Sequence, residues 1–445
     1  MNIAARTPAQ GAGKPENGKS ENGKPENGKS ENGKSENGKL ENGKYDVGGV
    51  VMDRPFKIRR LGHFGFSAKN LKACLEFYTK DIGFKVTDPM NFAANPANRD
   101  KFAGIEDTHQ YFMRHGTDHH SFVMADRRII DINYADKPHK PNHSINQMTW
   151  QVGSLREVVN AIPYFESTGT PINRAGRDMP GSNWHVYPFD PEFHRNELYY
   201  GIEQIGWNGK AKPKELYARG FHHAPDLPQI SEEEEIARAE ASGVNMETGY
   251  RQREDMPEIF DVDGVLLARP FKVVKIGPIG LYVDDVDAVS RFYEQVMGFT
   301  FTRETNVQGA RVRYLRCNTE HHSLAIADKS LRAKLGAPDD TTCMSFGLQL
   351  ANYRQLRDAV DFLKSRGREM ADMPGELFPG MDYAACFVDP DGVRVILYCY
   401  MEQVAAGAVP AQPGVIANMK PATWPERIAP RADVYDGEAY LGPWG

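Results

Sequence analysis

The chain has 445 residues, 40% of them hydrophobic and 26% charged, and a formal net charge of −6 at pH 7. That length is too great for one ordinary hydrophobic core, so two domains are expected. The acidic balance, with no basic stripe interleaved with aromatic residues, gives no reason to expect nucleic-acid binding. No stretch approaches the roughly 18 consecutive apolar residues that cross a bilayer, so no membrane partner is expected either.

The cysteines and the first residues both favour a cytoplasmic protein. The N-terminus lacks a charged leader followed by an apolar run, which is the pattern of a secretory signal. There are five cysteines, an odd number, and none forms a Cys-x-x-Cys pair. This usage is typical of reduced thiols packed in a core rather than of a disulfide framework.

Residues 1–45 are expected to form a disordered tail. Glu-Asn-Gly-Lys recurs six times between Glu16 and Lys44. Alternating charge, a glycine every five residues and few apolar side chains do not offset the entropy of ordering such a segment. We expect no catalytic residue in it.

The rest of the chain repeats itself. Arg54-Pro-Phe-Lys-Ile58 is answered 215 residues later by Arg269-Pro-Phe-Lys-Val273. In each copy a strand pattern, an amphipathic helix pattern and further strands follow, and the same order then recurs within the copy. Self-similarity of this kind predicts an α+β fold of two halves, each with two modules of a strand, a helix and several strands.

The first half is expected over 46–205 and the second over 264–405. Their predicted elements are, in chain order, strand 57–68, helix from Leu71, strand from Phe84 and strand 121–126; strand 145–152, helix 154–169 and strand 196–205; strand 275–283, helix 284–299 and strand 323–328; and strands 343–350 and 393–401. Gly83 is expected to end the first helix.

Two further segments complete the predicted organisation. Residues 206–263 are polar and proline-bearing, with a short helix expected after Ser231, which would cap it ahead of a run of four glutamates. This segment is too long for a simple linker and is expected to fold over one half as a lid. The C-terminal extension 406–445 would do the same for the other half.

Differences between the two copies point to the first half as the site of any chemistry. At the matched place in the opening strand, the first copy has His63 and the second has Pro278. At the matched place in the last strand, the first has Glu197 and the second has Ile396. Proline and isoleucine side chains neither bind a metal nor move a proton, so the second half is expected to be structural.

This pattern resembles the vicinal oxygen chelate superfamily, which includes glyoxalases, bleomycin resistance proteins and extradiol dioxygenases. Among its members the chain is most similar to the two-domain type I extradiol ring-cleaving dioxygenases. The resemblance covers about 350 residues and implies four βαβββ modules, paired into two half-barrel domains. It also implies a half-barrel cleft that holds Fe(II), or alternatively Mn(II) or another divalent metal. Those enzymes usually carry the metal in their C-terminal half, whereas here only the N-terminal half has the residues for it.

By this resemblance His63 and Glu197 stand where two of the three metal ligands belong. The place of the second ligand histidine, eight residues before Leu155, is taken by Gln147. A glutamine carbonyl oxygen is a harder donor than imidazole and favours a more oxygen-loving ion, although glutamine does serve as a ligand in the glyoxalase branch. Three other histidines could supply the missing imidazole instead: His143, His222 and His223.

The resemblance also implies two catalytic residues. His120 matches the acid–base histidine, and Tyr187 matches a tyrosine that hydrogen-bonds the substrate. The His-His-Ser sequence recurs in the second half, so His120 could instead serve folding. Substrate-binding roles are expected for His119, Trp150, Asp178 and His185, where Asp178 occupies the place of an expected histidine.

The function expected is ring cleavage of a catechol-like aromatic substrate by O2, in aromatic compound catabolism. Two alternatives stay open. A glyoxalase-like, metal-dependent isomerase or lyase would use the ion to polarise a carbonyl. A non-catalytic member would bind a planar ligand without turning it over. Assembly into a homo-oligomer is expected from the resemblance alone.

Overall fold

We analysed a computed structural model of the chain. The residues it describes are 39–137, 144–177, 180–181, 183–217, 223–405, 407–411 and 414–429. Most of the expected N-terminal tail lies outside these residues, as do Asp178, His143 and His222. Within the described part, no helix is both long and apolar enough to cross a membrane. All five cysteines are free thiols, and four of them are buried.

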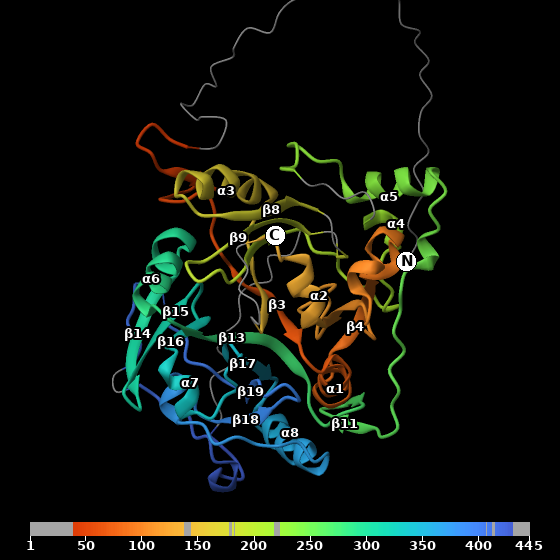
Figure 1. The fold of residues 1–445 in the computed structure, drawn as a ribbon. Coiled ribbons are helices and arrows are strands. Elements are labelled where there is room, and N and C mark those ends of the chain that lie inside the picture. The colour runs from red at the N-terminus through yellow and green to blue at the C-terminus, as the bar shows by residue number, and fades with distance from the viewer. Residues whose placement is uncertain are drawn as a thin grey trace, which may run out of the picture.

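The first half of the chain forms one eight-stranded sheet from two modules (Figure 1). The first module contains β3 (Arg60–Ala68), α1 (Leu71–Glu76), β4 (Lys85–Asn91), β5 (His109–Arg114), β6 (Phe122–Asp126) and α2 (Arg127–Asn133). The second contains β7 (Ile145–Gln151), α3 (Leu155–Ser167), β8 (Ile172–Gly176), β9 (Trp184–Pro188) and β10 (Asn196–Tyr200).

The strand order of this sheet is β4-β5-β6-β3-β7-β10-β9-β8. The opening strands β3 and β7 pair antiparallel at its centre, and each pairs in parallel with the last strand of its own module. The opening and closing strands of both modules are therefore neighbours. Side chains on four central strands meet above the middle of the sheet, although they are far apart in the chain.

The second half repeats this arrangement in a seven-stranded sheet ordered β14-β15-β16-β13-β17-β19-β18. Its elements are β13 (Val273–Val283), α6 (Val286–Arg291), β14 (Thr300–Val307), β15 (Ala310–Arg316), β16 (Leu324–Asp328), α7 (Ser330–Lys334), β17 (Cys343–Leu350), α8 (Tyr353–Ser365), β18 (Ala384–Val388) and β19 (Arg394–Tyr398). The counterpart of β8 is reduced to a single bridge between Met370 and Phe387. The predicted α+β fold of paired modules is confirmed.

Local sequence explains where the helices begin and end. The side chain of Asn70 caps α1 by accepting a hydrogen bond from the backbone of Ala73, and Ser154 caps α3 in the same way. After α1 the chain continues as a π-helical segment, η1 (Phe77–Ile82), which ends at Gly83 with φ of 100°. A glycine reaches this left-handed conformation without steric cost. The predicted helix end at Gly83 is therefore confirmed.

The two halves share one hydrophobic core. Phe64 and Phe122 of the first half both stack on Phe346 of the second, with ring centroids 4.9 and 5.4 Å apart. Tyr78 in η1 donates a 3.0 Å hydrogen bond to Asp389 of the second half. Tyr293 in the matching π-helical segment η6 (Phe292–Met297) donates reciprocally to Asp190 at 3.3 Å. Each half thus donates a tyrosine hydrogen bond to the closing turn of the other half.

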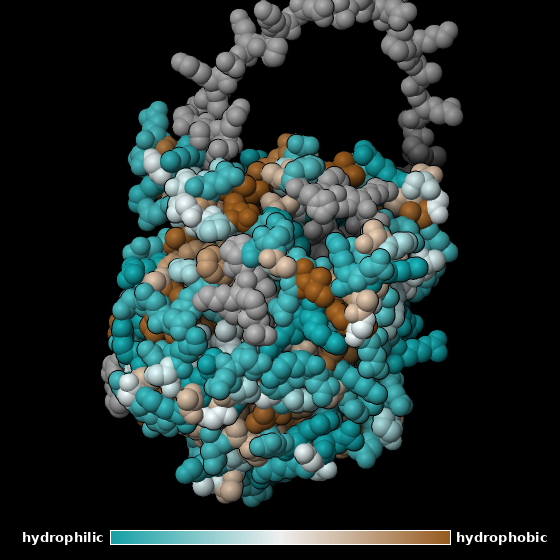
Figure 2. All heavy atoms as spheres, in the orientation of Figure 1, coloured by the Kyte–Doolittle hydropathy of each residue, from teal (hydrophilic) through white to brown (hydrophobic). Residues whose placement is uncertain are grey.

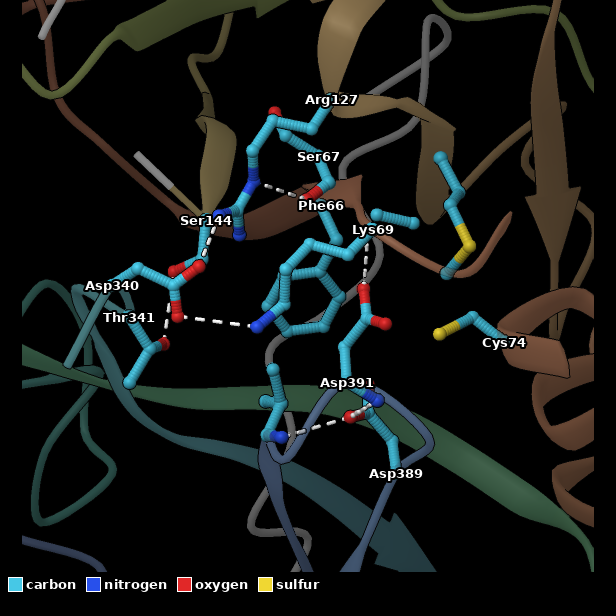
Figure 3. Close-up of a pocket in the computed structure, with 13 residues that line it drawn as sticks. Phe66, Ser67, Lys69, Cys74, Arg127, Ser144, Asp340, Thr341, Asp389 and Asp391 are labelled. Carbon is cyan, nitrogen blue, oxygen red and sulfur yellow. Dashed lines mark hydrogen bonds and ion pairs between the residues drawn. The ribbon is translucent and has the colours of Figure 1, made fainter. Parts of the chain in front are cut away.

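A small polar pocket lies on this contact between the halves (Figure 3). Lys69 and Arg127 from the first half both bind Asp340 from the second, at 3.2 and 2.7 Å. The backbone N–H of Lys69 donates to Asp391 at 2.5 Å. The pocket volume is about 10 Å³, roughly the space that one water molecule needs. It belongs to the interface and is too small for a ligand.

The connecting segment lies against the first half. Its helices are α4 (Lys214–Tyr217) and α5 (Glu232–Ala241), and Ser231 caps α5 as predicted. Glu235 of α5 forms a two-bonded ion pair with Arg177, at 2.8 and 3.0 Å. Its role as a lid stays a prediction.

The C-terminal extension packs on the second half, where Trp424 lies against Tyr353 and Tyr383. Two short hairpins precede the opening strands of the two halves. They are β1 (Tyr45–Val47) with β2 (Val50–Met52), and β11 (Phe260–Val262) with β12 (Val265–Leu267). On the face in Figure 2, hydrophilic residues dominate and apolar ones form separate small patches.

Candidate active site

A cavity of about 440 Å³ opens in the first half and contains most of the predicted site. His63, His120, Gln147 and Tyr187 all lie in its wall. His63 lies on β3, His120 just before β6, Gln147 on β7 and Tyr187 on β9. The sheet brings these strands together from both modules. The cavity wall is also rich in amide side chains, and its apolar part includes Phe92, Phe112 and Ile130.

Glu197 lies behind this wall at the centre of a hydrogen-bond network. Its side chain is fully buried, and its Oε2 lies 3.0 Å from Nε2 of His63. The same oxygen accepts from the amide of Gln147 at 3.1 Å and from the hydroxyl of Thr149 at 2.9 Å. Asn183 donates to the other oxygen, Oε1, at 2.7 Å. Five side chains thus converge on one point.

The strand register explains this convergence. In β3 His63 is paired with Thr149 of β7, and Thr149 is paired in turn with Glu197 of β10. Neighbouring strands are about 4.8 Å apart, so the long side chains of His63 and Glu197 meet over the short side chain between them. Gly62, just before the histidine, is needed for another close approach, because a Cβ there would lie 2.1 Å from the hydroxyl of Tyr199.

The network keeps Glu197 ionised despite its burial. Burial by itself raises the pKa of this carboxyl group, but His63, through its charge and its hydrogen bond, together with His185 and a hydrogen bond from Tyr187, lowers it to about 2. The cavity therefore has a carboxylate set just behind its wall at neutral pH. A buried charge in a protein is either paired or bound to a metal.

His120 lies next to His63, with ring centroids 4.2 Å apart, and Phe112 packs edge-on against it at 5.0 Å. Burial lowers the pKa of His120 well below its usual value, and the imidazoles of His63 and His119 lower it further. His120 is therefore neutral at physiological pH. A neutral imidazole in the cavity wall is able to accept a proton.

The same histidine pair occurs in the second half. The Nδ1 atoms of His119 and His120 are 3.0 Å apart, and those of His321 and His322 are 3.1 Å apart. In both pairs the rings are perpendicular. Repetition in a half without ligands shows that this geometry serves the fold. A catalytic role of His120 therefore stays a prediction, which rests on its position beside His63.

Three residues expected to bind substrate lie outside the cavity wall. Trp150 points to the opposite side of β7 from Gln147 and Thr149, because side chains alternate along a strand. Its indole donates to Asn196 at 2.8 Å and its ring packs on Phe299 of the second half. We therefore correct the expectation for Trp150, whose ring serves the contact between the halves and not a ligand.

His119 and His185 are also fully enclosed by protein. His119 bonds to Asp88 at 2.7 Å and is not part of the cavity wall. His185 lies 3.7 Å from Oε1 of Glu197 and edge-on to Tyr187. Both support residues of the wall rather than forming it. Of the alternative ligand histidines, His223 bonds to the backbone of Ala224 and is not part of the wall.

Two residues of the network were not predicted from the sequence, Thr149 and Asn183. The signal for Thr149 was available, because it follows Gln147 by two residues and so shares its face of the strand. Nothing in the sequence near Asn183 indicates its contact with Glu197, since the segment that carries it precedes β9 and no strand period applies there.

The donors present fit a divalent cation that prefers oxygen. His63 and Gln147 both lie within hydrogen-bond distance of Glu197, at 3.0 and 3.1 Å, so an imidazole, an amide and a carboxylate are available at one place. The amide oxygen and nitrogen of Gln147 exchange places by rotation. Among the described residues, no group of three or more His, Cys, Asp and Glu side chains is placed to hold a metal. A site here therefore requires the amide.

In the second half the corresponding cleft is filled. Ile396 takes the place of Glu197 and is buried with Met344, Tyr398 and other apolar side chains in a separate hydrophobic cluster. The hydroxyl of Tyr398 donates to the backbone of Gly277 at 2.9 Å. No polar network equivalent to that around Glu197 is present among the described residues there. That the chemistry-bearing residues are confined to the first half stays a prediction.

The sequence of the chain matches the model of one family twice, over residues 60–198 and 275–397. That family is the Glyoxalase/Bleomycin resistance protein/Dioxygenase superfamily. The two matches run from β3 to β10 and from β13 to β19, so they cover both halves. The chain therefore belongs to this superfamily and is of its two-domain type, as the resemblance predicted.

Several solved structures have a similar fold. A halotolerant catechol dioxygenase, BphC, is 15% identical, with a TM-score of 0.48 over 80% of this chain and 91% of that one. The Mn(II)-bound glyoxalase from Novosphingobium aromaticivorans is 16% identical, with a TM-score of 0.49 over 86% and 98%. Homoprotocatechuate 2,3-dioxygenase from Brevibacterium fuscum is 14% identical, with a TM-score of 0.49 over 82% and 86%. No curated protein matches the chain.

Proposed function

We propose that the protein is an extradiol-type dioxygenase, which cleaves a catechol-like aromatic substrate with O2 at a mononuclear Fe(II) site. One observation carries the proposal: His63, Gln147 and Glu197 converge from three neighbouring strands beside a cavity of about 440 Å³. The superfamily to which the chain belongs includes dioxygenases. His63, the amide oxygen of Gln147 and Glu197 would hold the metal.

When bound by these three residues, a divalent iron would supply a binding place for the two oxygens of a catechol and for O2, and would allow electron density to pass from the ring to oxygen. The chain's own residues do the rest. His120, neutral and beside His63, would accept the proton of a substrate hydroxyl and return it later in the reaction. Tyr187 lies in the wall and would hydrogen-bond the ionised substrate oxygen. Both atoms of O2 would enter a ring-opened semialdehyde acid.

The experiment is O2 uptake by anaerobically purified, Fe(II)-loaded protein with a panel of catechols. The proposal predicts O2 consumption together with a yellow ring-opened product, and loss of both in Glu197→Ala. Elemental analysis is the second readout, with metal content expected to fall in Glu197→Ala. Glu157→Ala is the matched control, because Glu157 is a buried glutamate of the same half that binds the backbone of Lys57 at 2.8 Å. Iron-loaded protein inert to the whole panel would reject ring cleavage.

A second candidate is a glyoxalase-like isomerase or lyase, and the amide of Gln147 favours it. An oxygen donor in place of imidazole suits an ion that polarises a carbonyl and needs no redox change. Activity with Zn(II), Ni(II) or Co(II) and no O2 uptake would identify this candidate. Both carboxylate oxygens of Glu197 accept hydrogen bonds from protein side chains. This is also compatible with a third candidate, a protein that only binds its ligand. Protein without stoichiometric metal, in which His63→Ala still binds ligand, would identify that one.

A further inference from the structure

The cavity of the candidate active site is lined largely by neutral amide side chains. Seven of its described lining residues are asparagine or glutamine: Asn98, Gln110, Asn133, Asn146, Gln147, Asn173 and Asn183. Each of these side chains has both a hydrogen-bond donor and an acceptor, and none carries a charge. Such a wall suits a ligand group that is itself neutral and has both donors and acceptors.

Gln110 differs from a structural glutamine because it is buried without a hydrogen-bond partner. Only 5% of the residue is exposed, and its side chain makes no hydrogen bond to any residue that the structure describes. It lies two residues before Phe112 on β5, so the two side chains share one face of the strand, and both line the cavity. A buried amide without a partner destabilises a fold, so its presence calls for an explanation.

The second half shows that the fold does not require an amide at this position. Gln110 is paired with Ala125 of β6. In the second half the matching pair is Val312 with Ala327. Val312 is fully buried in the apolar cluster that fills the second cleft. At this matched position the amide belongs to the half that contains the cavity, so we attribute it to ligand binding rather than to packing of the sheet.

Asn146 shows the same contrast on β7. The pairing of β3 with β7 shifts its register at Asn146, which is the extra residue of a β-bulge. A bulge redirects a side chain, and Asn146 therefore lines the cavity together with its neighbour Gln147. Its Oδ1 accepts from Arg195, whereas its amide N–H groups have no acceptor in the described part of the chain. The matched residue of the second half is Met344, which belongs to the apolar cluster.

The strand register also gives the spacing between Gln110 and the proposed metal ligands. Ala125, which pairs with Gln110, is also paired with Ser67 of β3. Ser67 follows His63 by four residues. At about 3.3 Å per residue, the rows of His63 and Gln110 are about 13 Å apart along the sheet. The two side chains and a bound ion occupy part of this distance, and the remainder suits one aromatic ring with a short substituent.

We infer that the substrate carries a neutral carboxamide, and that Gln110 binds this group through two hydrogen bonds. A carboxamide has a donor and an acceptor side by side, so it pairs with a glutamine amide in both directions, as glutamine does with the N6 and N7 edge of adenine. Asn146 supplies a further donor in the same wall. The inference rests on the proposed function for the identity of the reacting ring.

The test is equilibrium binding to the metal-free protein, without O2, using 3,4-dihydroxybenzamide and 3,4-dihydroxyacetophenone. The two probes have nearly the same shape, but the methyl ketone only accepts hydrogen bonds. We expect the amide to bind at least about fivefold more tightly, which is the gain from one additional neutral hydrogen bond. Benzamide should exceed acetophenone by a similar factor, which separates the result from any recognition of the two ring hydroxyl groups.

Gln110→Met should abolish the preference for the amide while the ketone still binds, which shows that the cavity is intact. Gln110→Val is the second variant, because the second half folds with valine at the matched position. Gln349→Met is the control and should keep the full preference. Gln349 lies on β17 of the second half, where its amide donates to the backbone of Cys399 at 3.4 Å.

Three results would overturn the inference. The first is equal binding of amide and ketone to the wild type, or binding of neither. The second is tighter binding of 3,4-dihydroxybenzoate than of the amide, because the site would then select a charge. The third is an unchanged preference in both Gln110 variants.

These outcomes separate the inference from the proposed function. A preference for the amide without any O2 uptake by the iron-loaded protein would support the amide site and reject ring cleavage. O2 uptake with the ketone as efficient as with the amide would support ring cleavage and reject the amide site.

Discussion

Nε2 of His63 lies 3.0 Å from Oε2 of Glu197, although the two residues belong to different modules. Thr149 lies between them, because it is paired with His63 on one side and with Glu197 on the other. The contact depends on the antiparallel pairing of the two opening strands at the centre of the sheet. A one-residue shift of that pairing would turn one of the two side chains to the other face. The candidate site is thus a product of how the modules are joined.

Gln147→His should increase the affinity of the protein for Fe(II). The variant completes a set of two imidazoles and one carboxylate, which iron prefers over a set that contains an amide. Gln147→Leu, of similar size but without a donor, should bind less metal than the wild type. Anaerobic iron titration of the three proteins measures the order. Equal iron affinity of the His and Leu variants would show that residue 147 is not a ligand.

Thr149→Val should destabilise the protein by about 1.5–3 kcal/mol, because it removes one hydrogen bond to a buried carboxylate without changing the shape of the side chain. Thr87→Val is the matched control. Thr87 is also buried, but its hydroxyl has no hydrogen-bond partner among the described residues. Its replacement should be neutral or slightly stabilising. Urea unfolding gives both free energies, and the prediction fails if the two variants lose the same amount.

The buried Asp389 should make stability depend on pH. Burial raises its pKa from 3.8 to about 7, so the folded protein binds this proton more tightly than the unfolded chain. The contribution of this proton to the free energy of unfolding is complete below about pH 4 and is lost as the pH rises through 7. At about 1.4 kcal/mol per pH unit, the loss amounts to about 4 kcal/mol.

Asp389→Asn should remove this slope between pH 4 and 7, because asparagine keeps the oxygen that accepts from the backbone of Asp391 and Val393. Asp361→Asn, at an exposed position of α8, should leave the slope as in the wild type. Urea unfolding at several pH values measures all three proteins. A wild type whose stability does not fall over this range would contradict the assignment.

Ile396→Glu should destabilise the second half without producing a metal site. A carboxylate there would be buried in an apolar cluster, and an unpaired buried charge costs about 3–5 kcal/mol. Ile396→Val should cost only about 1 kcal/mol. Thermal unfolding measures both, and elemental analysis of the Glu variant should show no additional metal. Metal uptake by Ile396→Glu would mean that the second cleft is more open than its packing indicates.

The sequence contained most of the fold because the modules repeat. Matched motifs such as Arg54-Pro-Phe and Arg269-Pro-Phe, with equal spacings to the tyrosines of the helices, predicted four modules in two halves. The same comparison placed the candidate site, because His63 and Glu197 have no polar counterpart in the second copy. These are properties of the chain order and of residue type, which a sequence records directly.

Only the tertiary structure decided how the side chains meet. Trp150 and Gln147 lie on one strand, but the alternation of the strand sends one into the contact with Phe299 and the other into the cavity. Asn183 reaches Glu197 from a segment with no recognisable pattern. The place of each side chain depends on strand register and on contacts between residues far apart in the chain. A linear sequence states neither, so the network around Glu197 appears only when both modules are folded together.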